Sequence, residues 1–192
     1  MPIVKNREYR NYVELTDIQD NYIVEGYATT FEPYVMGERD GIKFYERISK
    51  DAFLNADFSD VIMQYDHQGR VYARKSNGTL DVFVDDYGLK IRADLSKSKG
   101  ARELYEEIKE GLITKMSWGF TISDENYDRQ KRTREILGVK KVYDVSAVSI
   151  PANDSTEIHA RSFIEGVIDA ERQELLERSK ALLKLKLEME QI

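Results

Sequence analysis

KMSWGFTIS, from Lys115 to Ser123, combines residues typical of a β-strand with a serine in its interior. Strands favour aromatic and β-branched side chains, and here they stand beside Gly119 and Ser117. The neighbours of Ser117 do not form the strand-to-helix elbow that presents the nucleophile of many serine hydrolases. The stretch therefore predicts a strand. It leaves open whether Ser117 is a small buried hydroxyl or a nucleophile.

The sequence on both sides of this stretch also has the pattern of strands. From Tyr9 to about Pro151, β-branched and aromatic residues alternate or cluster between Gly, Asn and Asp turn signals. The segments with this pattern are YRNYVELTD, NYIVEGYATTFE, DVIMQYDH, GRVYARKSNGTLDVFVDDYGLKIRADL, ITKMSWGFTIS and KKVYDVSAVSIP. They predict one mainly β domain over residues 1–160, built as an antiparallel sheet or barrel.

Two short helices are expected to interrupt the strands. One spans Ser49 to Asn55, where Ser49 can cap the helix, and the other spans Lys99 to Glu110 and ends at Gly111. The segment SDENYDRQKRTREILGVKK, residues 123–141, lacks apolar periodicity. We expect it to form a long polar hairpin loop.

After Arg161 the pattern becomes helical and continues to the end of the chain, so residues 161–192 form a second unit. Its apolar residues recur about every seven positions and make a stripe between charged flanks. The residues of this stripe are Val167, Ile168, Leu175, Leu176, Leu182, Leu183 and Met189. An amphipathic helix of this kind packs either on its own domain or on a partner, and the pattern does not decide between them.

Composition excludes several functional classes. The chain has 192 residues, of which 41% are hydrophobic, so it can bury one sizeable core. A formal net charge of −6 disfavours binding to nucleic acid or to anionic membranes. The absence of cysteine excludes disulfides and thiolate chemistry. No apolar run is long enough for a signal peptide or a membrane span, so we expect neither.

Few residues can carry catalysis. The only histidines are His67 and His159, and no HExxH, phosphate-binding loop or dinucleotide fingerprint is present. The acids also lack the spacing of a calcium loop. We therefore expect no cofactor and no metal. What remains is acyl transfer by a serine, with a histidine as base and an acid to orient the ring.

His67, Ser117 and Asp144 are the candidates for these three roles. His67 follows an apolar strand in MQYDHQG, and Asp144 begins the strand expected to pair with that of Ser117. Asp66 is a rival for the orienting role, although neighbouring strand side chains point to opposite faces. His159 is expected to be exposed. The residues alone also fit structural roles, with His67 in a surface turn and Ser117 as a buried hydroxyl bonded to the backbone.

Five blocks in a fixed order resemble the prohead protease family of tailed bacteriophages. These capsid-maturation serine proteases are related in fold to herpesvirus assemblin. The resemblance extends from Ile23 to Thr156 and rests on the collinear set rather than on any single block. The blocks are VEGYATTFE, SKDAF, MQYDHQG, EGLITKMSWGF and VYDVSAVSIPANDST.

The resemblance assigns His67 as general base, Ser117 as nucleophile and Asp144 as third member of a triad. Relatives commonly have Glu at the third position, so the shorter Asp144 implies a closer approach to His67. It also implies a closed antiparallel β-barrel of about seven strands with short helices around it. The oxyanion donors would be backbone N–H groups, expected in the loop after Pro151.

The implied function is that of an endopeptidase inside the immature procapsid, in the host cytoplasm. It would cleave scaffold or the scaffolding segment of the major capsid protein, and itself, so that these proteins are its expected partners. The C-terminal helix would dock on scaffold or join copies of the chain in a homo-oligomer. Two alternatives remain: a catalytically inactive capsid-assembly protein with the same fold, and a hydrolase with an oxygen-ligated metal.

Overall fold

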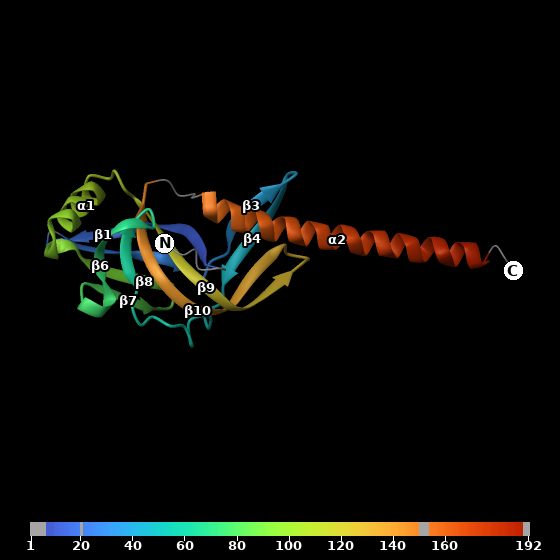
Figure 1. The fold of residues 1–192 in the computed structure, drawn as a ribbon, viewed down its shortest axis with the longest axis horizontal. Coiled ribbons are helices and arrows are strands. Elements are labelled where there is room, and N and C mark those ends of the chain that lie inside the picture. Colours follow the sequence, from blue (N-terminus) through green and yellow to red (C-terminus); the bar gives the residue numbers. More distant parts are fainter. Residues whose placement is uncertain (1–6, 20, 150–153, 190–192) are drawn as a thin grey trace.

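The computed structural model describes residues 7–19, 21–149 and 154–189, and in this part the chain is mainly β (Figure 1). The helices are α1 (Lys99–Lys109) and α2 (Asp154–Met189), with the short 3-10 helices η1 (Lys75–Asn77) and η2 (Leu95–Lys97). The strands are β1 (Glu8–Gln19), β2 (Ile23–Thr30), β3 (Tyr34–Arg39), β4 (Ile42–Ile48), β5 (Ile62–Tyr65), β6 (Gln68–Arg74), β7 (Leu80–Val84), β8 (Gly88–Asp94), β9 (Lys115–Asp128) and β10 (Thr133–Val148).

The strands form one 10-stranded sheet whose main path is β3-β4-β10-β9-β1-β2-β8-β7, with β5 on β10 and β6 on β5. The predicted mainly β fold is confirmed, but the sheet has more strands than the expected seven or so. It is also not purely antiparallel, because β4 and β5 both run parallel to β10. The 16 residues of β10 give β4 and β5 separate stretches of the strand. Among the described residues no pairing joins β3 to β7, so closure into a barrel is not confirmed.

The predicted polar loop over residues 123–141 is wrong. β9 and β10 continue as paired strands through this segment, and only residues 129–132 form the turn. The polar pattern is misleading because the buried side chains include a charged one, that of Arg134, beside the apolar Ile136.

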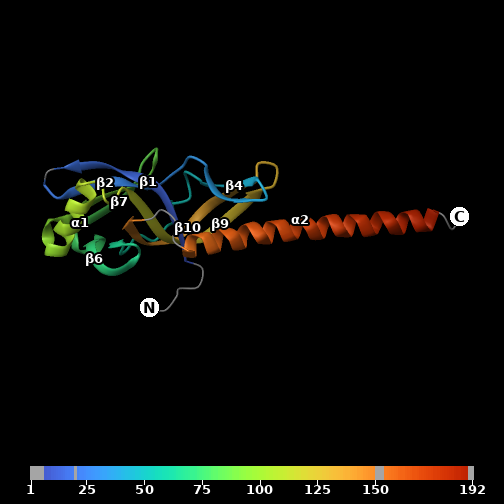
Figure 2. The same cartoon turned by 90° about the horizontal axis from the view of Figure 1, so that it is seen from above.

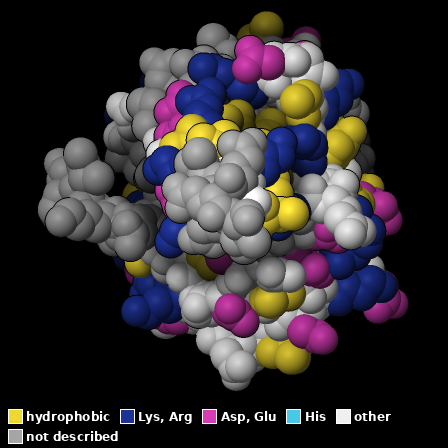
Figure 3. All heavy atoms as spheres, turned by 90° about the vertical axis from the view of Figure 1, so that its right-hand side faces the viewer, with side chains coloured by type: hydrophobic (Ala, Val, Ile, Leu, Met, Phe, Trp, Pro, Cys, Tyr) yellow, Lys and Arg dark blue, Asp and Glu magenta, His cyan; other side chains and the backbone are white. Residues whose placement is uncertain are grey.

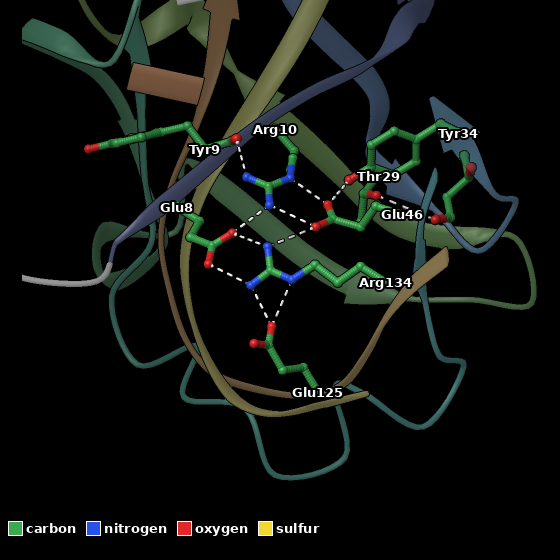
Figure 4. Close-up of polar contacts among 9 residues, drawn as sticks. Glu8, Tyr9, Arg10, Thr29, Tyr34, Glu46, Glu125 and Arg134 are labelled. Atoms are coloured by element: carbon green, nitrogen blue, oxygen red, sulfur yellow. Dashed lines mark hydrogen bonds and ion pairs between the residues drawn. The ribbon is translucent and has the colours of Figure 1, made fainter. Parts of the chain in front are cut away.

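Arg134 belongs to a largely buried set of ion pairs that we call the ion network (Figure 4). Its members are Glu8, Arg10, Glu46, Glu125 and Arg134. Arg10 donates to Glu46 Oε2 at 2.7 Å and to the Tyr9 carbonyl at 2.8 Å. Arg134 donates to Glu8 at 2.8 and 3.0 Å and to Glu46 at 3.1 Å. Buried charges need such partners, and here β1, β4, β9 and β10 supply them.

The helix expected from Lys99 is confirmed as α1. The Ser98 hydroxyl accepts a hydrogen bond from the N–H of Ala101 at 3.1 Å, and Gly111 follows the helix with φ of +73°. The helix expected over Ser49 to Asn55 is wrong. This segment makes consecutive turns, in which the N–H of Ala52 bonds the carbonyl of Ser49 and the N–H of Leu54 bonds the carbonyl of Asp51, since a helix this short does not offset its nucleation cost.

The core lies on one face of β9. Trp118 and Phe120 are buried there and stack with ring centroids 3.8 Å apart. Because strand side chains alternate, Ser117 and Gly119 point to the opposite face. The packing of the two aromatic rings therefore fixes the face on which Ser117 lies.

α2 begins at Asp154, earlier than the predicted start after Arg161. Near its N-terminal end Ile164 is buried, and Phe163 meets Tyr127 edge to face at 5.7 Å. Farther along, the helix extends away from the sheet (Figures 1 and 2), with Leu175 and Leu182 exposed by 64% and 62%. On the face of the molecule toward which α2 points, hydrophobic side chains lie among basic and acidic ones (Figure 3). In the described part of the chain no helix is long and apolar enough to span a membrane.

Candidate active site

His67 lies at the tip of the hairpin between β5 and β6. Tyr65 pairs with Gln68, so Asp66 and His67 form a two-residue loop, with φ of +46° and +57°. Both angles lie in the left-handed region that two-residue hairpins require and that β-strand residues avoid. The Asp66 carboxylate accepts hydrogen bonds from the N–H and hydroxyl of Ser149, at 3.0 and 2.9 Å. These bonds tie the hairpin tip to the end of β10 and hold His67 in place.

Ser117 and Asp144 share one face of the neighbouring strands β9 and β10. Asp144 pairs with Gly119, and Ser146 pairs with Ser117. Directly paired residues project to the same side of a sheet, as do residues two apart on one strand. The register therefore places the hydroxyl and the carboxylate together, although they are far apart in the sequence.

The His67 ring bridges the two groups. Its Nε2 lies 2.6 Å from Ser117 Oγ, and its Nδ1 is hydrogen-bonded to Asp144 Oδ1. Ser146 donates to the same Oδ1 at 2.9 Å, and Arg7 forms an ion pair with the other oxygen, Oδ2. We call these five residues the serine cluster. Ser117 and Asp144 have no exposed surface.

The electrostatic environment keeps the ring neutral at neutral pH. Burial, followed by the positive charge of Arg7, lowers the pKa of His67 from 6.5 to about 3. A neutral imidazole that donates through Nδ1 to Asp144 has a free lone pair on Nε2. It can therefore accept the proton of the Ser117 hydroxyl.

The structure brings together the three residues that the sequence proposed, His67, Ser117 and Asp144. Asp66, the rival acid, is instead bonded to Ser149. His159 falls within α2, but its side chain lies outside the described residues. The loop after Pro151, where oxyanion donors were expected, includes residues 151–153, which also lie outside them.

Sequence reasoning missed Ser146 and Arg7. Ser146 stands two residues after Asp144, and strand alternation could have placed it on the same face. Arg7 gave no signal, because its contact with Asp144 joins positions 137 residues apart. Among the described residues, no group of three or more His, Asp or Glu side chains could hold a metal ion.

Comparison with known proteins gives a consistent assignment. The profile of the family described as Caudovirus prohead serine protease matches residues 11–167, a range that includes His67, Ser117 and Asp144. The chain is 25% identical over 146 residues to the prohead protease of Enterobacteria phage HK97. That alignment covers 76% of this chain and 62% of the relative, so the chain spans less than two thirds of the relative's length. No solved structure matches the chain.

Proposed function

The chain belongs to the family of caudovirus prohead serine proteases, and from this premise we propose that it is a serine endopeptidase of procapsid maturation. Ser117 is the nucleophile, His67 the general base and Asp144 the group that orients the ring. The observation that carries this assignment is the continuous hydrogen-bonded path from Ser117 through His67 to Asp144. A buried path of this kind favours a role for Ser117 in acyl transfer over a purely structural role for its hydroxyl.

In the proposed reaction, Ser117 Oγ attacks the scissile carbonyl carbon while its proton passes to His67 Nε2. Asp144 stabilises the resulting imidazolium and holds the tautomer that leaves Nε2 facing the serine. His67 then protonates the leaving amine as the peptide bond breaks. Water hydrolyses the acyl-enzyme by the same path, with His67 again acting as base.

The buried state of Ser117 supports a latent conformation. Because Ser117 has no exposed surface, a peptide reaches its Oγ only after neighbouring groups move. A protease that is assembled together with its substrates needs such restraint until the shell is complete. The substrates we propose are scaffold, the scaffolding segment of the major capsid protein and the chain itself, all inside the procapsid.

The outer part of α2 is the proposed docking element. Ile164 is buried against the sheet, so we place the boundary of the catalytic domain within α2 rather than at its start. The exposed leucines from Leu175 onward would then bind scaffold or a second copy of the chain.

A serine-directed fluorophosphonate tests the enzyme assignment without knowledge of the cleavage site. The probe should attach to Ser117, as located by peptide mapping, and Ser117→Ala should abolish the label. Labelling at another serine would overturn the assignment. Because a latent protease would also resist the probe, the inactive assembly protein would be favoured only if labelling and self-cleavage, followed by intact mass, are absent both from the isolated chain and from the chain assembled with scaffold and capsid protein. Loss of self-cleavage on adding a chelator would favour a metal hydrolase.

A further inference from the structure

Arg7 occupies the side of Asp144 that faces away from His67. The Oδ1 oxygen of Asp144 accepts from His67 and Ser146, whereas Oδ2 is paired with the Arg7 guanidinium. The Asp144 side chain is fully buried and that of Arg7 is 21% exposed. The carboxylate thus has a fixed partner on each oxygen, and it cannot rotate away from His67 without breaking the ion pair with Arg7.

Gly119 provides the space for this ion pair. It is the residue of β9 that pairs with Asp144. A Cβ atom at this position would lie 2.5 Å from Asp144 Oδ2 and 2.8 Å from both Arg7 Nε and Nη2. Glycine weakens the interior of a strand, so its presence here is explained by the close approach of the two charged groups.

Two aromatic rings hold the guanidinium. Its central carbon lies 4.5 Å from the centroid of Tyr143 and 5.1 Å from that of Tyr9. The Tyr9 ring also lies 4.4 Å from the His67 ring, centroid to centroid. Arg7, Tyr9 and Tyr143 therefore form a support built around Asp144 and His67.

We infer that Arg7 is a positioning residue for the proposed reaction: it fixes the Asp144 carboxylate so that Oδ1 stays on His67. This inference rests on the proposed function of the serine cluster. The groups that face His67 are Ser117 from β9, Asp144 from β10 and Tyr9 from β1, while Asp66 is held by Ser149. Asp144 favours the protonated ring, and Arg7 opposes it.

The test compares Arg7→Gln, Arg7→Lys and the exposed control Arg39→Gln in the full-length chain. The rate of fluorophosphonate labelling at Ser117 is measured from pH 4 to 9. Arg7→Gln should label roughly 10- to 100-fold more slowly, since a loosened base and orienting group lose alignment. The pH at which its rate falls by half should move up toward the ordinary histidine value of about 6.5.

Arg7→Lys should restore the pH dependence, because the charge returns, but only part of the rate, because lysine cannot reproduce the planar fork. Arg39→Gln should match the parent protein. Faster labelling of Arg7→Gln would mean that Arg7 blocks the site instead of supporting it. A rate and pH profile equal to those of the parent would also overturn the inference. In either case labelling of the parent at Ser117 would leave the proposed function intact.

A second readout does not depend on activity or on substrate. The chain has two histidines, so the imidazole signals of His67 can be followed by NMR in Ser117→Ala protein. Adding Arg7→Gln to this protein should raise the pKa of His67, and Arg7→Lys should not. An unchanged pKa in the folded double variant would overturn the inference even if neither protein reacts with the probe.

Discussion

Residues 7–10, at and just before the start of β1, send alternate side chains to two clusters that differ in how their charges are paired. Arg7 belongs to the serine cluster and Tyr9 contacts it, whereas Glu8 and Arg10 belong to the ion network on the opposite face. In the ion network, Glu46 is shared by Arg10, Arg134 and the hydroxyl of Tyr34, so no charge depends on a single bond (Figure 4). Such a network stabilises the fold only as long as it stays complete.

The serine cluster is paired differently. Arg7 and Asp144 neutralise each other, which leaves a neutral imidazole and a hydroxyl whose hydrogen-bond partner is His67. A proton can move along this path, whereas the arginines of the ion network hold theirs permanently. Proximity of buried polar groups alone therefore does not indicate a catalytic site. A neutral imidazole next to a hydroxyl, as in His67 and Ser117, is the more specific sign.

His67→Ala should have the largest effect on activity. Removing the base should lower the labelling rate at Ser117 by roughly five to six orders of magnitude, as for triad residues that act as one unit. The melting temperature should change by only a few degrees, because the charges of Arg7 and Asp144 remain paired. A labelling rate near that of the parent would contradict the assignment of His67. A loss of the fold would remove the contrast with the ion network.

Asp144→Asn should come next, with a loss of about 10⁴-fold in labelling rate. Asparagine keeps the shape but favours the wrong tautomer of the ring and no longer stabilises its cation. Asp66→Asn is the matched control: it lies next to His67 but bonds Ser149, so its effect should be far smaller. The reverse ranking of the two variants would transfer the orienting role to Asp66.

Glu46→Gln should reduce stability rather than chemistry. It leaves Arg10 and Arg134 buried without their shared counter-charge, and we expect a loss of about 3–5 kcal/mol in the free energy of unfolding. Glu125→Gln, at the 40% exposed rim of the ion network, should cost less than about 1 kcal/mol. Denaturant titration measures both. The folded fraction of Glu46→Gln should label at the parental rate, and a large loss of rate would show that the two clusters are coupled.

The ion network also shows which parts of the fold can be predicted from the sequence. Alternating apolar residues identified the strands around Trp118 and Val145, and a glycine marked the C-terminal end of α1. The same reasoning wrongly predicted a loop over residues 123–141. A strand whose buried side chains include an arginine has no apolar period, and the acids that neutralise Arg134 come partly from β1 and β4, far away in the sequence.

For the serine cluster, the order of the sequence blocks was sufficient to select His67, Ser117 and Asp144. Local pattern alone left each of them with a structural alternative. The direct pairing of Gly119 with Asp144 depends on bulges in the pairing of β9 with β10, which turn signals do not reveal. The contact of Arg7 with Asp144 could not be predicted, because nothing near Arg7 in the sequence indicates a buried carboxylate.

Acid should affect stability partly through His67. Its pKa is about 6.5 in the unfolded chain and is lowered to about 3 in the fold, so below pH 6.5 the unfolded state binds a proton that the folded state does not. Stability should therefore fall as the pH decreases from 6.5 toward 3. At pH 5 the loss of stability due to His67 is about 2 kcal/mol, because each pH unit below 6.5 costs about 1.4 kcal/mol. His67→Gln should lose less stability than the parent between pH 8 and 5 in denaturant titrations. Parallel pH profiles would show that the ring is not held neutral.

The smallest effect on the fold is expected from Leu175→Asp combined with Leu182→Asp in the outer part of α2. Both side chains are more than 60% exposed and contact neither cluster, so the free energy of unfolding and the labelling rate at Ser117 should both stay at the parental values. If this part of the helix joins copies of the chain, the charged variant should be a monomer in light scattering at concentrations where the parent associates, because burial of two carboxylates is unfavourable.

Ile164→Ala is the contrasting change: its side chain is buried against the sheet, so it should cost about 2 kcal/mol or more without altering association. If the double aspartate variant unfolds instead, the outer helix packs on its own domain and is not a docking element. If the parent is itself a monomer, self-association is excluded, and co-sedimentation of parent and variant with scaffold then tests the other proposed partner.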